Sequence, residues 1–312
     1  MTREILLQKI KHTLARNGFQ YQDFSDTNSC FDVIARKQEQ VLIIKVLFNI
    51  DALRAEHARD LKKMAYAFNG YSIIVGEKSK VFTLKDNVLY DRYELPVLSF
   101  IGFTHSLQEK FPMQRAYKGQ HIVELDAQRL QNERKSNELT LKELSQSVGI
   151  SLESLHRYEH GSPAHIDAAE KLERILHTTL VQPINVFEKP FVSKEDWEKP
   201  FSPSVIERLE EVGIKLSVFE RAPITAAGKE HPLLVSHVEN KHQLVKKAQH
   251  LEKAEDITQY TGMMISSGKP PEMEGKIPII REDELNTFSS AKDILRSLRE
   301  KKKSHSLRED KK

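Results

Sequence analysis

The sequence has little of what marks a secreted, disulfide-bonded or membrane-spanning protein. Its 312 residues include one cysteine, Cys30, which excludes an internal disulfide and fits a reducing cytoplasm. No apolar run approaches the roughly 18 residues that a membrane span needs. Residues 1–14 carry charges throughout an amphipathic helical pattern, so they do not form a signal peptide. We therefore expect a cytoplasmic protein without a membrane partner.

Motifs for catalysis and for cofactors are equally scarce. No histidine-rich motif is placed to activate Cys30, so we expect an ordinary buried thiol and not a nucleophile. The single tryptophan, Trp197, lies in a proline-rich stretch and is expected to anchor that stretch onto a domain. Apart from one incomplete nuclease-like pattern, we expect no enzymatic activity, no cofactor and no metal ion.

The net charge is low, but it is unevenly distributed. The whole chain is +3, which alone does not predict binding to nucleic acid. Residues 119–182 have 7 Lys or Arg against 10 Asp or Glu, whereas residues 1–118 have 18 against 13 and the last 21 residues have 9 against 4. Phosphate contacts normally supply much of the affinity for DNA. If the middle of the chain binds DNA, its flanking segments or a second copy must supply positive charge.

Residues 139–161, LTLKELSQSVGISLESLHRYEHG, predict two short helices joined by a tight turn. Thr140 and Glu143 have the spacing of a capping box, in which the hydroxyl and the carboxylate each satisfy a backbone N–H. Gly149 follows at the turn, because glycine adopts a positive φ without steric cost. The apolar residues of the first helix recur at helical spacing: Leu141, Leu144 and Val148.

Ser151 is expected to cap the second helix, with Leu155 and Tyr158 pointing inward. The side chains left facing outward are those of Leu152, Glu153, Ser154, His156 and Arg157. An exposed helix after such a turn is the arrangement of a helix-turn-helix, whose second helix enters the major groove of DNA. The sequence therefore predicts DNA recognition by residues 151–158.

This stretch resembles the DNA-binding domain of the lambda-repressor and Cro class through the pattern E-L-x-x-x-V-G-I-S-x-x-x-L-x-x-Y-E-x-G. Arg134 stands where that family has an arginine that pairs with a glutamate, here Glu159, and residues 163–177 match its fourth helix. Over its full length the chain resembles archaeal helix-turn-helix regulators of about this size. The resemblance implies an all-α domain over residues 119–182 that binds double-stranded DNA, flanked by two α/β parts.

Position assigns roles on DNA to the exposed residues. Arg157 is suited to guanine, Leu152 to a thymine methyl group and Glu153 to a cytosine amine. Hydroxyls and backbone N–H groups at the start of the second helix are suited to phosphate. The expected DNA-binding set is Thr140, Lys142, Ser151, Leu152, Glu153, Ser154, His156, Arg157 and His160. In the family a glutamine that contacts DNA often stands at the position of Leu141.

Residues 1–118 predict an α/β domain. The expected elements are a helix, two strands, a helix and a third strand, over residues 2–17, 31–36, 40–48, 51–67 and 71–76. The second strand is nearly continuous in Val, Leu and Ile, which is typical of a strand covered on both faces. This order resembles the restriction-endonuclease-like fold.

In that fold an Asp ends one strand and a Glu-x-Lys ends the next, and Asp32 and Lys45 match two of these three positions. Ile43 stands where the acid belongs, so too few oxygen ligands remain for Mg²⁺. We interpret Asp32 as a turn residue, Lys45 as a strand-end charge and the domain as an inactive relative. Asp51 or Glu56 could supply a displaced acid, so a Mg²⁺-dependent nuclease targeted by the helix-turn-helix is the alternative.

The remaining chain predicts a linker, a second α/β domain and a tail. Residues 183–203 hold four prolines and are expected to form a semi-rigid linker, followed by an α/β domain over residues 204–298 and a basic, solvated tail over residues 299–312.

Buried strands centred on Leu234 and Met264 are spaced as those centred on Ile43 and Ile73. We therefore hypothesise a duplicated domain, with Ser236 in the place of Lys45, which requires that both domains have the same strand order.

The sequence thus favours a sequence-specific DNA-binding transcriptional regulator. One recognition helix contacts only a few base pairs, so we expect a homodimer that binds two half-sites. Besides a nuclease, the alternative is a protein-bridging or coactivator module, which would show no sequence preference on DNA.

Overall fold

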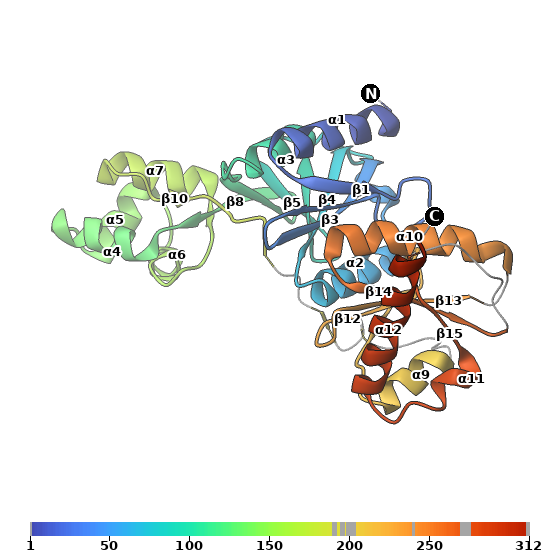
Figure 1. The fold of residues 1–312 in the computed structure, drawn as a ribbon. Helices are drawn as coiled ribbons and strands as arrows, with labels where there is room; N and C mark the ends of the chain where they lie inside the picture. The colour runs from blue at the N-terminus through green and yellow to red at the C-terminus, as the bar shows by residue number, and fades with distance from the viewer. Residues whose placement is uncertain are drawn as a thin grey trace.

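The structure, a computed structural model, has three parts along the chain (Figure 1). It describes residues 2–188, 192–193, 197, 204–238, 241–268 and 276–309. The α/β parts that contain the two ends of the chain pack against each other, while a helical lobe from the middle of the chain projects to one side. Within the described ranges, no helix is both long and apolar enough to cross a lipid bilayer.

The N-terminal part is a mixed sheet with helices on both faces. Its elements are α1 (Arg3–Arg16), β1 (Gln20–Asp23), β2 (Val33–Lys37), β3 (Gln40–Asn49), the 3-10 turn η1 (Ile50–Ala52), α2 (Ala55–Ala67), β4 (Tyr71–Lys78), β5 (Val88–Arg92), β6 (Leu95–Ser99) and α3 (Phe100–Ser106). The strand order is β1-β2-β3-β4-β6-β5; β1 to β3 are antiparallel neighbours, and β3, β4 and β6 are parallel. This part has the restriction-endonuclease-like architecture expected from the sequence.

The centre of this sheet is β3, whose residues 41–46 are buried on both faces. Leu6 and Ile10 of α1 belong to the core on one face, and Leu61 and Met64 of α2 belong to the core on the other. The continuous apolar run of β3 is explained by this double coverage.

A hairpin of β7 (Gln114–Tyr117) and β8 (Gln120–Leu125) leads into the helical lobe. The lobe contains α4 (Ala127–Ser136), α5 (Leu141–Val148), α6 (Leu152–Tyr158), β9 (Ala164–His165), α7 (Ile166–Leu176) and β10 (Val181–Gln182). Both β9 and β10 pair with β8, so the lobe begins and ends on the same strand. Its core is formed by residues from all four helices, including Leu130, Leu144, Leu155 and Leu172.

The start of the predicted linker packs on the N-terminal part. Ile184 and Val186 are buried in the core under α1, and the Ile184 N–H donates to the Pro112 carbonyl at 2.8 Å. The Trp197 ring contacts the Tyr66 ring of α2 edge-on, with 5.1 Å between centroids, as an anchor would. Residues 189–191, 194–196 and 198–203 of the predicted linker lie outside the described residues.

The C-terminal part is a second mixed sheet. Its elements are α9 (Ser204–Glu211), β11 (Ser217–Val218), β12 (Ala226–Gly228), β13 (Leu233–Val238), α10 (Lys241–Thr258), β14 (Thr261–Ser266), β15 (Ile279–Arg281), α11 (Glu282–Leu285) and α12 (Ala291–Glu309). The end of this part contains two helices, α11 and α12. The second of these continues into the segment predicted as a solvated tail, because the run of Lys, Arg, Glu and Leu there favours helix.

The two α/β parts have the same strand order, as the duplication hypothesis required. In β11-β12-β13-β14-β15 the first three strands are antiparallel neighbours and the last three are parallel, as in β1-β2-β3-β4-β6. Individual hydrogen bonds also correspond: the Phe24 N–H donates to the Asp32 carbonyl at 2.8 Å, and the Phe219 N–H donates to the Thr225 carbonyl at 2.9 Å. We call residues 3–106 the N-terminal repeat and residues 204–309 the C-terminal repeat.

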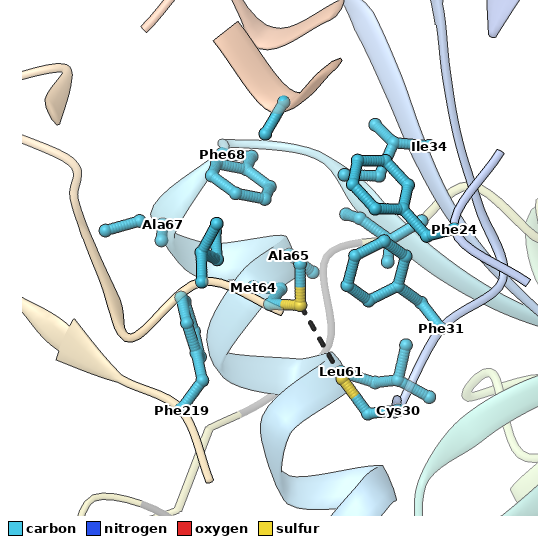
Figure 2. Close-up of a cluster of buried hydrophobic side chains, with 14 of the residues drawn as sticks. Phe24, Cys30, Phe31, Ile34, Leu61, Met64, Ala65, Ala67, Phe68 and Phe219 are labelled. Atoms are coloured by element: carbon cyan, nitrogen blue, oxygen red, sulfur yellow. Dashed lines mark hydrogen bonds between the residues drawn. The ribbon is translucent and has the colours of Figure 1, made fainter. Parts of the chain in front are cut away.

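The two repeats contact each other reciprocally. The N-terminal repeat's α2 packs on β11 and β12, while α10 packs on β1 and β2. Figure 2 shows the shared cluster, in which Phe219 of the C-terminal repeat faces Met64 and neighbouring residues of α2. Cys30 lies in this cluster with its Sγ 3.7 Å from the Met64 Sδ, and burial raises the pKa of its thiol. Cys30 is therefore the inert buried thiol that the sequence predicted.

Candidate nucleic-acid interface

The helix-turn-helix is built from caps that the sequence encodes locally. Thr140 Oγ1 accepts the Glu143 N–H at 3.2 Å and Glu143 Oε2 accepts the Thr140 N–H at 2.8 Å, which completes the predicted capping box of α5. Gly149 ends α5 with a φ of 77°, a conformation that favours glycine. Ser151 Oγ then accepts the Ser154 N–H at 3.0 Å and caps α6. These caps determine where the turn begins and ends.

One side of α6 is held by the lobe. Leu155 and Tyr158 are buried in its core. At the end of α6, Glu159 accepts two hydrogen bonds from the Arg134 guanidinium of α4, at 2.6 and 2.9 Å. Arg134 also donates to the Leu139 carbonyl at 2.9 Å, and its pairing with Glu159 raises the pKa of the guanidinium. The pair joins α4 to α6 without using any group on the outer side of α6.

The other side of α6 faces solvent. The exposed residues are Ser151, Leu152, Glu153, His156, Arg157 and His160, and Ser154 is half-buried. Half of the surface of Leu152 is exposed, so the outer side of α6 includes an apolar side chain. The rings of His156 and His160 stack with 4.1 Å between centroids, and His160 Nδ1 lies 2.7 Å from the His156 carbonyl oxygen. This surface combines hydroxyls, an apolar group, imidazoles and a guanidinium.

Thr140 and Lys142, the expected phosphate contacts of α5, are also exposed. The Thr140 hydroxyl already lies 2.7 Å from Glu143 Oε2. Its contact with a phosphate would therefore compete with a carboxylate that the capping box holds in place, whereas Lys142 has no such restraint.

The N-terminal repeat carries a second set of polar residues, Asp32 and Lys45, which match two positions of the nuclease pattern by sequence. Asp32 is fully buried immediately before β2, and Lys45 is buried in the middle of β3. Lys45 Nζ lies 3.4 Å from Asp32 Oδ1 and donates to the Ser29 carbonyl at 2.8 Å. The interpretation of Lys45 as a strand-end charge is therefore wrong, because Lys45 lies inside β3. Asp32 does lie in the bend before β2, but it is fully buried there. Both are buried because they are paired with each other, and Asp32 is also paired with a third residue.

That third residue is Arg3, whose guanidinium donates to Asp32 Oδ1 at 2.6 Å from the start of α1. The other oxygen of Asp32 accepts the Val46 N–H at 2.7 Å. Arg3 was not among the expected site residues, because it is 29 residues from Asp32 and no local motif joins them.

This donor set does not fit the divalent metal ion that nuclease folds of this type use. Mg²⁺ requires several oxygen ligands, whereas here one carboxylate is bound by two cationic side chains and by a backbone N–H. Ile43, at the position of the second acid, is fully buried in an apolar cluster. Among the described residues no group of three or more His, Cys, Asp or Glu side chains is placed to hold a metal ion.

The two displaced acids considered from the sequence do not complete the site. Asp51 is bound to the Arg92 guanidinium and accepts the Lys80 N–H at 2.7 Å. Glu56 lies near Arg54, with 3.8 Å between the charged atoms. Neither side chain lines the cavity next to Lys45.

Two family models match the chain. One, described as a PD-(D/E)XK superfamily domain, matches residues 3–112, and the other, described as helix-turn-helix, matches residues 130–182. The first model covers the N-terminal repeat and the second covers the lobe from α4 to β10. No solved structure matches the chain significantly.

Curated relatives match over almost the whole chain. A protein of Pyrococcus furiosus is 30% identical over 96% of this chain and 98% of its own length, and one of Archaeoglobus fulgidus is 28% identical over 95% and 97%. A relative from Methanosarcina barkeri is 29% identical over 98% and 99%. Each is named "Putative HTH-type transcriptional regulatory protein". The chain belongs to this archaeal family of helix-turn-helix transcriptional regulatory proteins.

Proposed function

We propose that this protein is a sequence-specific regulator of transcription that inserts α6 into the major groove of double-stranded DNA. The observation that carries the proposal is the outer side of α6, which the lobe leaves exposed while holding the helix by its other side and by the Arg134–Glu159 pair. In Figure 1 the lobe projects away from both repeats, so neither repeat covers α6. A surface that merely packed within the chain would not keep Leu152 in water.

The proposed contacts follow from the chemistry of that surface. Arg157 reads guanine, Glu153 accepts from a cytosine amine, and Leu152 contacts a thymine methyl group, with His156 beside them. Ser151, Ser154, Lys142, His160 and, less strongly, Thr140 contact the sugar–phosphate backbone. Base contacts set the sequence preference, and backbone contacts set the register of the helix in the groove.

The charge of the lobe is the reason to propose a homodimer. Residues 119–182 carry three more acidic than basic residues, so one lobe attracts phosphate poorly. Two copies, each supplying one recognition helix and basic flanking segments, would bind half-sites about one helical turn apart. We propose residues 119–182 as the DNA-binding domain, between an α/β domain over residues 1–118 and another that begins at residue 204 and, with α12, includes residues 299–309 of the predicted tail; the linker is at 183–203.

Selection of bound duplexes from a random library tests this function. The expected result is an enriched motif with two-fold symmetry. Enrichment of no sequence would contradict the proposal and favour a bridging module. Light scattering with and without the selected DNA tests the dimer, and a monomer in both samples would exclude it.

Arg157→Ala tests the role of α6 in reading bases. The variant should lose about 1–3 kcal/mol of affinity for the selected site and little for random duplex. Arg174→Ala is the matched control, since Arg174 is an exposed arginine of the same lobe on α7. If Arg157→Ala weakened both duplexes equally, Arg157 would be a backbone contact and not a reader of sequence.

We also propose that the N-terminal repeat is not a nuclease. The support is the buried Asp32, which two cations already bind, and Ile43 in the place of the second acid. Incubation of the selected duplex with Mg²⁺ or Mn²⁺ should give no cleavage. Cleavage that Asp32→Ala abolishes would overturn this proposal and leave the DNA-binding role intact.

A further inference from the structure

We propose that a cavity between the two repeats binds a small phosphate-bearing molecule through Lys45, Arg54 and Arg221. The cavity has a volume of about 500 Å³ and lies beside the Asp32–Lys45 pair, with His57 and Arg221 on its wall. We call it the inter-repeat cavity. It is distinct from the helix-turn-helix, and its ligand can be tested in the absence of DNA.

The charge of the inter-repeat cavity is the first argument. Its lining includes the cationic side chains of Arg3, Lys45, Arg54 and Arg221, whereas Asp26 is the one acidic residue among the described residues that line it. Asp32, behind the wall, balances one more of these cations and Glu56, 3.8 Å from Arg54, balances another, which leaves an excess of one positive charge. A concave wall of one sign concentrates the opposite charge, so the cavity favours an anion.

Arg221, from the C-terminal repeat, has a fixed backbone and an exposed side chain. The Glu220 and Arg221 N–H groups donate to Asp60 Oδ2 of α2 at 2.8 and 2.5 Å, and the Arg221 carbonyl accepts the Cys30 N–H at 2.6 Å. The Arg221 backbone is therefore fixed against the N-terminal repeat, while its side chain is exposed and has no carboxylate partner among the described residues. A guanidinium on a fixed backbone loses less entropy when it binds a ligand.

The environment of His57 agrees with a positive wall. Burial lowers the pKa of its imidazole, and the charges of Lys45, Arg54 and Arg221 lower it further, against the opposing charge of Glu56. His57 is therefore a neutral hydrogen-bonding group among cations near pH 7, suited to an oxygen of an anionic ligand.

Size and shape favour a phosphate-bearing small molecule. A second cavity of about 460 Å³ shares Asp26, Thr27, Asn28 and Arg221 with the first and continues to Lys246 and His250 of α10. Volumes in this range hold a nucleotide-sized ligand and not a duplex. Planar arginine forks match phosphate oxygens in pairs, and Lys246 would extend the same attraction along the second cavity.

The cavity also lies where the duplicated fold brings equivalent loops together. Residues 24–32 of the N-terminal repeat and residues 219–225 of the C-terminal repeat join corresponding strands, and both loops line the second cavity. A ligand there contacts both repeats at once. Binding should therefore stabilise their association as well as fill the cavity.

Calorimetric titration of the full chain with inorganic pyrophosphate or ATP, in EDTA and without DNA, tests the proposal. Both probes should bind and raise the melting temperature, since a ligand that binds only the folded state stabilises it. Tighter binding of ATP would identify a nucleotide as the ligand, and equal binding would identify the phosphate groups alone. No binding of either probe at millimolar concentration would overturn the proposal.

Charge variants locate the site. Arg54→Gln and Arg221→Gln should each weaken binding about tenfold, in keeping with the loss of a charge-assisted contact. Arg299→Gln on α12, which does not line the cavity, is the control and should bind like the wild type. Melting of each variant without ligand shows whether it folds, and Arg54→Lys and Arg221→Lys should retain part of the affinity.

Two outcomes would contradict the cavity as the binding site. Equal weakening in Arg299→Gln would show binding to surface charge in general. An Arg54→Gln/Arg221→Gln double variant that lost as much affinity for random duplex as for ATP would assign these arginines to DNA backbone. Either result would leave the role of α6 untouched, which selection and Arg157→Ala test separately.

Discussion

The helical lobe and the N-terminal repeat each contain an arginine that binds a buried carboxylate, with different consequences. In the lobe, Arg134 binds Glu159 on the inner side of α6, and the outer side remains free. In the N-terminal repeat, Arg3 and Lys45 bind Asp32, the carboxylate that a nuclease would use for its metal ion. The same chemistry therefore leaves the proposed DNA-binding surface free in one region, and in the other it occupies the carboxylate that the nuclease resemblance would assign to a metal ion.

The C-terminal repeat shows what the fold itself requires at that position. Asp32 accepts the Val46 N–H at 2.7 Å, and in the C-terminal repeat the hydroxyl of Thr225 accepts the corresponding His237 N–H at 3.0 Å. Ser236 stands where Lys45 stands, fully buried and uncharged. The fold needs an acceptor for this N–H, whereas the charges are a property of the N-terminal repeat alone.

The largest expected loss of stability comes from breaking the Arg134–Glu159 ion pair of the lobe. Glu159→Ala leaves Arg134 buried without its carboxylate and should destabilise the lobe by about 3–5 kcal/mol, as when other buried pairs lose one partner. Denaturant unfolding followed by the helical signal measures the loss. Glu153→Ala on the outer side of α6 is the control and should change stability by less than about 0.5 kcal/mol. Similar losses in both variants would mean that the pair does not hold α6.

Asp60 is a buried carboxylate to which no arginine side chain bonds among the described residues. Its burial should make the stability of the folded protein depend on pH. Burial raises its pKa from 3.8 to about 6, although it accepts N–H groups from Glu220 and Arg221. The folded state therefore retains a proton that the unfolded chain loses, and stability should fall as pH rises from about 4 to about 6. At 1.36 kcal/mol per pKa unit, the loss is at most about 3 kcal/mol.

Asp60→Asn isolates this contribution. The amide oxygen can accept the same two N–H groups without carrying a charge, so the variant should lack the fall between pH 4 and 6 and should be at least as stable as the wild type at pH 7. Other carboxylates titrate in both proteins, so the difference between their unfolding free energies is the quantity to measure. Parallel curves would show that folding does not raise the pKa of Asp60.

Replacing Asp32 by its counterpart in the C-terminal repeat should change the folding stability by a smaller amount. Asp32→Thr gives the N-terminal repeat the acceptor of the C-terminal one, whereas Asp32→Ala leaves the Val46 N–H without a partner. Both remove the ion pair, so the difference between them isolates the hydrogen bond. We expect Asp32→Ala to be less stable than Asp32→Thr by about 1–3 kcal/mol, the cost of an unsatisfied buried donor. Equal stabilities would imply that only the charges matter.

The helix-turn-helix was predictable because its signals are local. The capping box of Thr140 and Glu143 and the left-handed Gly149 are all formed within a few residues, and the structure contains each. Its inner and outer sides followed from 3.6-residue periodicity, and Leu155 and Tyr158 are buried as predicted. Where the residues that form an element are also neighbours in sequence, a single sequence is enough to predict that element.

The elements missed from the sequence depend on distant partners. QYQD forms β1 and AAG forms β12, and neither strand was among the predicted elements. Both are short strands without an alternating pattern that exist by pairing with the next strand. The segment 100–106 forms α3, with Ser99 as its cap, and was not predicted either. Burial of Asp32 and Lys45 was missed for the same reason, since charged residues are buried only when paired and Arg3 lies far away in sequence.

The smallest expected effect is that of Mg²⁺ on the melting temperature, because the N-terminal repeat should not bind the ion. A metal ion at Asp32 would have to displace Arg3 and Lys45 and would gain a single carboxylate, because Ile43 offers no oxygen. Millimolar Mg²⁺ should therefore leave the melting temperature of the wild type and of Asp32→Ala equally unchanged. An ion bound tenfold above its Kd would stabilise the folded state by about 1.4 kcal/mol, which melting detects. A shift in the wild type that Asp32→Ala removes would show that the carboxylate still binds metal, and that its pairing with Arg3 is a reversible closed state of a working site.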